Sequence, residues 1–564
     1  MYVKLQAIIS FVIFWISSGL GKLLLFKLVK TLSLFNKTWS NILLKMVEVK
    51  SLLRKNLIWI VPVAILALLI LVFIPLLSGP EKISTPTYWP MAGWHSSTPE
   101  EHGFDSAKLA KALLTIREQN INIHSLLIIR NGEVVVDAYF YPYDGTTVHD
   151  QASVTKSVMT TLIAIADEQG KLQLDDPVVS YFPERTIPNL DDRKESITVR
   201  HLASMSSGLD CTSERDEATL NEMMESPDWV QFTLDRTVVW EPGSHFVYCS
   251  PGMHLLSPIL QHATGMTALD FAHQNLFDPM GITDVMWLSD PNGHNRGWAN
   301  LYLHPHDMAK IGYLWLNKGQ WEGKQIVSRD WVENSVKVQM DTGDDDDYGY
   351  GWWLSTDEPV SYSAIGRGGQ RILVVPAWNL IVVTTGGGFD FDEIEPLLVE
   401  TIVDLDKTLP ANPAGMVQLE ETLNAIVQPP EPQPVAPLPD MARNISGKTF
   451  AFEPNTLGIE NIRFDFNDSD EAILYLTLTD RGQMLPSPIG LDGVYRMYPG
   501  DYDLPAGQRG YWADAQTFVL EHDEIAKNDY FTFLMRFEGD RVVVEGLETA
   551  HELGVRFEGA LEYS

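Results

Sequence analysis

The sequence predicts an α+β layered fold: an antiparallel sheet flanked by helices, with a further helical region. We also expect an N-terminal transmembrane helix and a C-terminal antiparallel β domain. Three observations support this: an uncharged apolar segment at 57–77, strand patterns at both ends of residues 98–407 with helical patterns between them, and turn-separated strand patterns over residues 441–564. A chain of 564 residues is long enough to form more than one hydrophobic core.

Charge is unevenly distributed along the chain. The net charge is −34, yet residues 1–85 carry ten Lys and Arg against only Glu48 and Glu81. The remaining residues therefore carry −42, and so acidic a body repels nucleic acid and anionic membrane surfaces. We expect no nucleic-acid partner and interpret the acidic residues as a solvated surface.

The segment from Leu57 to Leu77 contains no charged residue. As a helix it would be ~31 Å long, which matches the ~30 Å apolar core of a bilayer. Lys50, Arg54 and Lys55 precede it and only Lys82 follows closely, so the positive-inside rule places the later chain outside the cytoplasm. The sequence lacks a small-residue cleavage site after this segment, which favours an uncleaved anchor and a periplasmic or extracellular body.

A second apolar stretch, residues 5–20, is shorter and runs into Lys22, Lys27 and Lys30. It is either a second span or an interfacial helix. A third reading is that translation begins at Met46, which gives a compact basic-then-apolar signal anchor. We assign residues 1–83 to a membrane region and leave these readings open.

The strand and helix patterns of residues 98–407 follow one another in a definite order. Residues 125–140 hold two strand patterns joined at Asn131-Gly132, a strong hairpin signal, and residues 372–385 hold a second pair. A helical pattern over 153–169 ends at Gly170, a residue type favoured at helix C-termini. We therefore expect one sheet assembled from distant segments.

Residues 408–440 combine a helix with a linker, because residues 429–439 contain six prolines and form a stiff spacer. Beyond this point, helical periodicity gives way to short strand patterns separated by Asn, Asp and Gly. The clearest runs are 462–466, 473–478, 531–537 and 542–544. They predict a small antiparallel β domain over 441–564.

A Ser-x-x-Lys motif, Ser153 to Lys156, opens the predicted helix at 153–169. Helical positions three apart share a face, so the lysine amine lies over the serine hydroxyl. Burial and the helix dipole both disfavour a protonated lysine here, which lets the amine act as a base. The Ser153 backbone N–H is free to stabilise an oxyanion. The same geometry fits a serine that only caps the helix, so the motif alone leaves both readings open.

Two further groups of residues follow in the chain. Tyr248-Cys249-Ser250 supplies a phenol, which beside a Ser–Lys pair can relay a proton to a leaving group. The run from Gly366 to Gln370 leads directly into a predicted strand, and its glycines allow a close approach to a substrate. Taken singly, a tyrosine of this kind is more commonly a buried structural residue, and a lone glycine run is usually a simple turn.

Together these residues are similar to the three ordered motifs of serine β-lactamases, DD-peptidases and their esterase and amidase relatives. The motifs are Ser153-x-x-Lys156, Tyr248-x-Ser250 and Arg367-Gly368-Gly369. The resemblance covers about residues 98–405 and implies the β-lactamase/DD-peptidase-like fold. Other segments resemble the turn after the nucleophile helix and the branch that contains 6-aminohexanoate-dimer hydrolases: 206–209, 297–298, 306–309 and 350–353.

The resemblance implies a role for each motif residue. Ser153 forms an acyl-enzyme, and Lys156 and Tyr248 share the general-base and general-acid steps. Ser250 orients the lysine and tyrosine. The oxyanion hole combines the N–H of Ser153 with that of Gln370, the residue after the third motif.

Arg367 replaces the lysine of the K-T-G motif, as a cation near the tyrosine or the substrate carboxylate. Gly368 removes the hydroxyl that helps to hold a β-lactam carboxylate, and the Gly368-Gly369 pair is typical of the esterase and amidase branch. The resemblance therefore favours hydrolysis of a small ester, amide or peptide without a cofactor. The alternatives are a DD-peptidase or weak β-lactamase acting on peptidoglycan-related substrates, and a non-catalytic sensor that is acylated.

The two cysteines, Cys211 and Cys249, are too few for a cysteine-built metal cluster. Cys249 adjoins Tyr248 and Cys211 follows the 206–209 turn, and the anchor predicts export, so we hypothesise a disulfide between them. His304 and His306 lack a carboxylate–histidine motif, and we expect no metal site there.

Overall fold

The computed structural model describes residues 88–211, 217–467, 469–550 and 553–562. The apolar segments at 5–20 and 57–77, on which the predicted membrane anchor rests, lie outside these residues. Within the described ranges, no helix combines the length and the apolar character that crossing a membrane requires.

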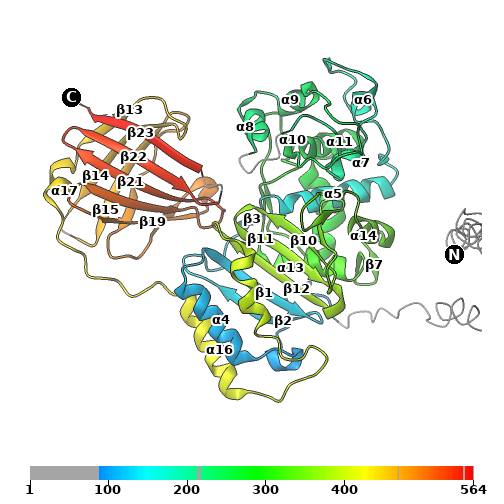
Figure 1. Ribbon diagram of the computed structural model, residues 1–564, viewed down its shortest axis with the longest axis horizontal. Coiled ribbons are helices and arrows are strands. Elements are labelled where there is room, and N and C mark those ends of the chain that lie inside the picture. Colours follow the sequence, from blue (N-terminus) through cyan, green and yellow to red (C-terminus); the bar gives the residue numbers. More distant parts are fainter. Residues whose placement is uncertain (1–87, 212–216, 468, 551–552, 563–564) are drawn as a thin grey trace, which may run out of the picture. The chain divides into compact units, whose positions relative to one another are not determined.

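A seven-stranded antiparallel sheet forms the centre of the first folded region, with the strand order β2-β1-β12-β11-β10-β9-β8 (Figure 1). The strands are β1 (Ile123–Arg130), β2 (Glu133–Tyr139), β8 (Asp347–Tyr348), β9 (Trp353–Ser355), β10 (Ser361–Gly366), β11 (Gln370–Val375) and β12 (Leu380–Gly386). The two predicted hairpins are β1–β2 and β11–β12, and β1 pairs with β12 so that Leu127 lies opposite Val383. The prediction of one sheet built from distant segments is therefore confirmed.

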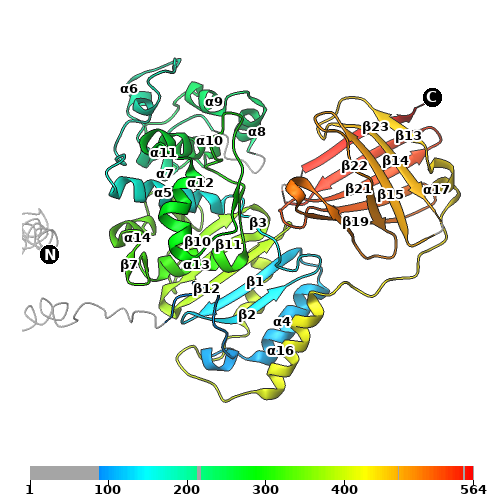
Figure 2. The same ribbon diagram turned by 180° about the vertical axis from the view of Figure 1, so that it is seen from behind.

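The sheet is buried on both faces because its strands place apolar side chains alternately on each side. Leu127 and Ile129 of β1 join the core beneath α5 (Val154–Glu168) and α13 (Pro305–Leu316). Leu126 and Ile128 join the opposite core. That second core is covered by α4 (Ser106–Glu118) and α16 (Pro413–Ile426), which lie side by side in Figures 1 and 2.

Helix α16 is the helix expected within 408–440. Its Leu419 and Ile426 are buried in the same core as Leu113 and Ile116 of α4. It is therefore part of the layer that covers the sheet, and the Pro-rich residues 429–439 that follow it have no regular secondary structure.

A helical region packs against α5 in the core that contains Leu127. Its helices are α7 (Val199–Ala203), α8 (Ala218–Glu225), α9 (Trp229–Asp235), α10 (Ser250–His254), α11 (Leu256–Thr264) and α12 (Ala268–Ala272). Leu202, Val230 and Leu256 contribute buried side chains to that core. This region carries Tyr248, which directly precedes α10.

The C-terminal residues form a closed barrel of nine strands in the described part of the chain, since β14 pairs with both β13 and β15. The strands are β13 (Thr449–Phe452), β14 (Ile459–Phe466), β15 (Glu471–Leu478), β17 (Ser487–Gly490), β19 (Pro505–Trp512), β20 (Thr517–Asp523), β21 (Tyr530–Glu538), β22 (Arg541–Glu548) and β23 (Leu553–Leu561). Pairing is antiparallel as predicted, except between β17 and β19, which are parallel. Phe450, Phe464, Phe518 and Phe537 fill the interior.

The connection between β20 and β21 contacts the region that holds the large sheet. Ala526 is fully buried, and its carbonyl accepts a hydrogen bond of 2.9 Å from the backbone N–H of Asp150. It packs with Val148, Tyr302 and Leu504 in a small apolar cluster. Because Asp150 lies three residues before Ser153, the barrel loop borders the segment that carries the expected nucleophile.

Candidate active site

Ser153 occupies the N-cap position of α5, at the end of a short strand, β3 (His149–Asp150). Gln151 donates its backbone N–H to Leu301 at 2.8 Å, and Ala152 donates its own to the carboxylate of Asp150 at 2.9 Å. Ala152 has a φ of +43°, a strained conformation for a residue with a Cβ, and these hydrogen bonds hold it. The Ser153 side chain makes no capping hydrogen bond, which argues against a purely structural cap.

Lys156 lies over the Ser153 hydroxyl as its spacing predicts. Its Nζ is 2.7 Å from Ser153 Oγ and 3.1 Å from the carbonyl oxygen of Trp298, and only 1% of the residue is exposed. Burial lowers the pKa of Lys156 to about 8; Glu217 opposes this shift and Arg367 reinforces it. About a tenth of the amine is therefore unprotonated at pH 7.

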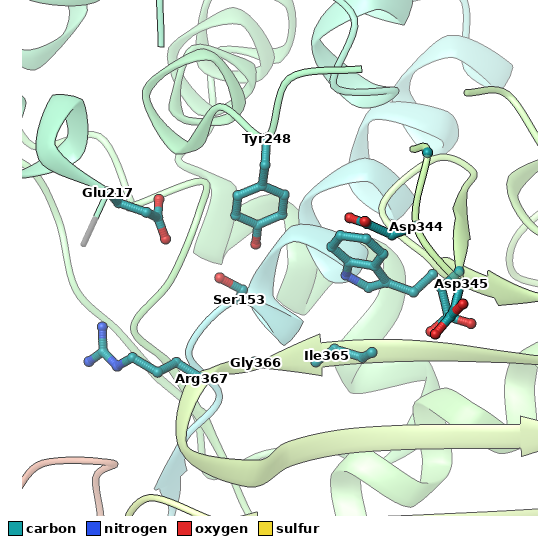
Figure 3. Close-up of a pocket in the computed structure, with 11 residues that line it drawn as sticks. Ser153, Glu217, Tyr248, Asp344, Asp345, Ile365, Gly366 and Arg367 are labelled. Atoms are coloured by element: carbon teal, nitrogen blue, oxygen red, sulfur yellow. The ribbon is translucent and has the colours of Figure 1, made fainter. Parts of the chain in front are cut away.

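Tyr248 completes a group of three around the serine. Its hydroxyl points at Ser153 in Figure 3, and Nζ of Lys156 lies 4.7 Å from the centre of its ring. Burial raises the pKa of Tyr248 well above its usual value, and a hydrogen bond with Ser153 opposes that shift only in part. The phenol therefore carries its proton at neutral pH. It can act first as a proton donor, and it can accept a proton only after it has given its own away.

Ser250 begins α10, two residues after Tyr248. Its Oγ is buried and has no hydrogen-bond partner among the described residues. The structure thus shows no direct hydrogen bond through which Ser250 orients Lys156 or Tyr248.

The glycine that lies against the nucleophile is Gly366, the last residue of β10. A Cβ placed there would be 2.5 Å from the carbonyl oxygen of Gln151 and 3.0 Å from the backbone nitrogen of Ser153. Its φ of −129° is open to any residue, so the glycine is needed for space and not for its backbone conformation. Its close contact with Ser153 N identifies β10 as the strand beside the serine.

The nearest neighbours of Gly368 and Gly369, the glycines of the expected third motif, are other residues. A Cβ at Gly368 would meet Asn528 at 2.6 Å, and one at Gly369 would meet the ring of Phe389 at 2.1 Å. Gln370, the expected oxyanion residue, lies in β11 opposite Gly366, and its buried side chain donates to the carbonyl oxygen of Gly386 at 2.7 Å.

Arg367 is held by the C-terminal barrel. Its Nε donates to Asn528 Oδ1 at 3.0 Å, and its Nη2 lies 3.4 Å from a carboxylate oxygen of Asp529. Figure 3 shows its side chain directed away from the hydroxyl of Tyr248. Arg367 was expected as a cation near the tyrosine or the substrate carboxylate, and the structure shows it in contact with the β20–β21 connection.

A cavity of about 810 Å³ opens beside Ser153, and we call it the acidic arm. Its lining includes Ser153, Tyr248, Trp353, Glu217, Asp344, Asp345, Asp346, Gly366 and Arg367. A second cavity of similar volume shares Ser153 and is also lined by Asn528, Thr549 and Ala550 of the barrel. Sequence reasoning missed Glu217 and the aspartates, and it included Gly366 in the glycine run without assigning it the contact with Ser153. The run of four aspartates at 344–347 was the available signal for the acidic arm.

The structure joins Cys211 and Cys249 in a disulfide, with a Cα–Cα distance of 5.6 Å. Cys249 is also the N-cap residue of α10, where its Sγ accepts the backbone N–H of Gly252 at 3.3 Å. The disulfide therefore fixes the backbone next to Tyr248. The two histidines considered for a metal pair with single carboxylates: His304 with Asp284 at 2.9 Å and His306 with Asp137 at 3.0 Å.

The family model described as "Beta-lactamase" matches residues 108–394, just over half of the chain. The chain belongs to the Beta-lactamase family. The resemblance inferred from the motifs is confirmed, and the matched residues include Ser153, Lys156, Tyr248 and Gly366 but not the barrel.

The chain is similar to several known proteins at low sequence identity. An uncharacterized protein of Alkalihalophilus pseudofirmus is 24% identical over 313 residues, 48% of this chain and 85% of the relative. A 6-aminohexanoate-dimer hydrolase of Paenarthrobacter ureafaciens is 23% identical over 291 residues, 46% of this chain and 71% of the relative. Among solved structures, a putative 6-aminohexanoate-dimer hydrolase from Bacillus anthracis gives a TM-score of 0.48 at 20% identity, covering 57% of this chain and 90% of that one.

Proposed function

We propose that this protein is a serine hydrolase that cleaves a small ester or amide through an acyl-enzyme on Ser153. The observation that carries the proposal is the buried Lys156 amine, 2.7 Å from the Ser153 hydroxyl. A lysine that forms no ion pair with a carboxylate among the described residues, and whose pKa is lowered to about 8, serves as a general base near neutral pH. Family membership and the name of the 6-aminohexanoate-dimer hydrolase relative support the same reaction class.

The proposed reaction has two steps. In the first, Ser153 Oγ attacks the substrate carbonyl carbon while its proton passes to the neutral amine of Lys156. Tyr248, which still holds its proton, protonates the leaving alcohol or amine as the bond to the carbonyl carbon breaks. In the second step a water molecule attacks the acyl carbon and gives its proton to the Tyr248 phenolate. The bond to Ser153 Oγ then breaks, the ammonium of Lys156 returns a proton to this oxygen, and the acid is released.

The oxyanion that forms in each step needs N–H donors. One is the backbone N–H of Ser153 at the start of α5, which has no partner within the helix. For the second donor we propose the backbone N–H of Arg367, because Gly366 lies against Ser153 N and Arg367 follows it in the lining of the acidic arm. This replaces Gln370, the donor expected from the sequence.

We propose that simple esters and amides are better substrates for this protein than β-lactams. Arg367 is the cation expected to bind the carboxylate of a β-lactam or of a D-Ala-D-Ala peptide, but it already contacts Asn528 and Asp529. Ile365, which precedes Gly366 in the lining of the acidic arm, provides no hydroxyl for the same carboxylate. Both features weaken the case for a DD-peptidase or a β-lactamase.

The proposal is tested by turnover of neutral p-nitrophenyl esters and amides by the purified full-length chain. We expect many turnovers per molecule, at least 1,000-fold less kcat/KM in Ser153→Ala, and unchanged kinetics in Ser180→Ala, an exposed serine outside the cavity. One stoichiometric burst without further turnover would instead indicate the acylated sensor. Equal activity in Ser153→Ala would refute the assignment of the nucleophile.

We also propose that the catalytic region lies outside the cytoplasmic membrane, anchored through residues 57–77. The apolar segment and the basic residues before it support this orientation. Pairing of Cys211 with Cys249 fits an oxidising compartment. Protease digestion of intact cells tests the proposal: cleavage of the catalytic region without lysis is expected, and full protection would contradict it.

A further inference from the structure

The acidic arm has a charge that ordinary acyl hydrolysis does not require. Four carboxylates line it: Glu217, Asp344, Asp345 and Asp346. Among the described residues of its lining, the one basic side chain is Arg367, and its guanidinium contacts Asn528 and Asp529. The excess negative charge therefore lies within the same cavity as the Ser153 hydroxyl.

The excess of negative charge is concentrated in the acidic arm and is smaller in the second cavity. The second cavity, which also contains Ser153, is lined by Arg296 and Arg371 in addition to its acidic residues. Figure 3 shows Asp344 and Asp345 on one side of Ser153 and Glu217 on the other. A substrate seated at the serine thus meets carboxylates in one direction and a mixture of charges in the other.

An aromatic wall accompanies these carboxylates. The rings of Trp353 and Tyr248 are stacked, with centroids 5.9 Å apart and planes inclined by 26°. Lys156 already lies against the Tyr248 ring, whereas Trp353 is half-buried and lines the cavity. An indole face beside carboxylates attracts organic cations, both through the ring quadrupole and through charge.

We propose that the acidic arm selects substrates with a cationic group, an ammonium or quaternary ammonium, near the scissile ester or amide. Trp353 and the carboxylates of Asp344 and Asp345 are its specificity-determining residues. This inference rests on the proposed function and names its substrate class. It also predicts that anionic substrates are disfavoured, since the same carboxylates repel them.

Two series of esters test the proposal, and each contains a cationic ester with its uncharged isostere. In the first, the acyl group is varied: the p-nitrophenyl esters of 4-(trimethylammonio)butyrate, of 5,5-dimethylhexanoate as its uncharged isostere, and of monoanionic glutarate. In the second, the alcohol is varied: acetylcholine against 3,3-dimethylbutyl acetate, with acid release followed in a pH-stat. The two series cover a cation on either side of the scissile bond.

In the full-length wild-type protein, kcat/KM is expected to be at least tenfold higher for the cationic than for the neutral ester in one of the two series. It is expected to be lowest for the anionic ester. At an effective dielectric constant of about 40, Coulomb's law gives roughly a fivefold effect on kcat/KM for one carboxylate about 8 Å from a cation. The cation preference should shrink when NaCl is raised from about 20 mM to about 500 mM, because salt screens exposed charges.

Substitutions in the acidic arm test whether its residues cause the preference for cationic esters. Asp344→Asn combined with Asp345→Asn should lower the ratio of cationic to neutral kcat/KM at least fivefold. Glu420→Gln combined with Glu421→Gln removes two exposed charges from α16 and should leave both esters unchanged. Trp353→Leu should lower the ratio for the quaternary ammonium ester and keep the salt dependence.

These measurements can refute the cationic specificity without refuting the proposed hydrolase activity. Ser153-dependent turnover of neutral esters with equal or lower kcat/KM for cationic ones in both series would refute the cationic specificity and leave the hydrolase standing. A cation preference that survives the double aspartate variant would refute the role of Asp344 and Asp345. Absence of turnover for every ester would overturn both proposals.

Discussion

The protonation of Lys156 should control the rate of acylation across the neutral pH range. With a pKa of about 8, the unprotonated fraction of the amine is roughly 1% at pH 6, 10% at pH 7 and 50% at pH 8. An unshifted lysine of pKa 10.5 would be only about 0.03% unprotonated at pH 7, so burial supplies roughly a 300-fold gain. We therefore predict that kcat/KM rises about 50-fold from pH 6 to pH 8 and levels off above pH 9.

The assay is kcat/KM for a neutral p-nitrophenyl ester from pH 5.5 to 10, read at the isosbestic wavelength of p-nitrophenol. This constant reports the ionisation of the free enzyme, and the neutral ester contributes no titration of its own. Lys156→Arg is the matched perturbation, because it retains a cation that stays protonated throughout this range. Its kcat/KM should fall at least 100-fold and lose the rising limb below pH 9.

Two results would refute this reasoning. A profile that is flat between pH 6 and 9 would show that no group with a pKa near 8 acts as the base. A rising limb that persists unchanged in Lys156→Arg would assign the titration to another residue.

Three further predictions concern close approach, the disulfide and a buried acid. Gly366→Ala should reduce kcat/KM at least 100-fold, because the new methyl group would lie 2.5 Å from the Gln151 carbonyl oxygen. Circular dichroism should show little loss of secondary structure. Near-normal activity of this variant would contradict the close approach of β10 to Ser153. Cys211→Ala combined with Cys249→Ala should lower the free energy of unfolding by about 4 kcal/mol in denaturant titrations, and wild-type thiols that alkylate without a reductant would contradict the disulfide. Burial raises the pKa of Asp523 to about 7, above its value of roughly 3.9 in the unfolded chain. Between these two pH values the folded protein binds one more proton than the unfolded chain. The folded protein therefore loses stability as the pH rises from about 4 to about 7. Asp523→Asn should accordingly raise Tm at pH 8 and not at pH 4, and equal shifts at both values would exclude this titration.

Local sequence patterns were sufficient to predict several elements of the fold, including the helix that positions the nucleophile. The hairpin at Asn131-Gly132, the helix of residues 153–169 and the short strands after residue 441 each follow from spacing or turn chemistry within a few residues. The Ser153–Lys156 contact follows in the same way, because two residues one helical turn apart meet wherever the helix is placed.

Contacts between distant segments were not predictable in this way. Both Gly366 and Gly368 lie beside Arg367 in the sequence, and only the registration of β10 against Ser153 shows which one meets the nucleophile. The partner of Arg367 is Asn528, 161 residues further along the chain, in a barrel for which the sequence contained no functional motif. The charge of the acidic arm likewise depends on a loop after residue 340 reaching a serine at 153.

The location of a covalent adduct tests the central claim most directly. The full-length protein is treated with a fluorophosphonate, which reacts with activated serine hydroxyls, and the modified peptide is identified by tandem mass spectrometry. We predict one phosphonylated residue, Ser153, with labelling abolished in Ser153→Ala and slowed at least 100-fold in Lys156→Arg. An adduct on another residue, or unchanged labelling in Ser153→Ala, would contradict the proposed active site.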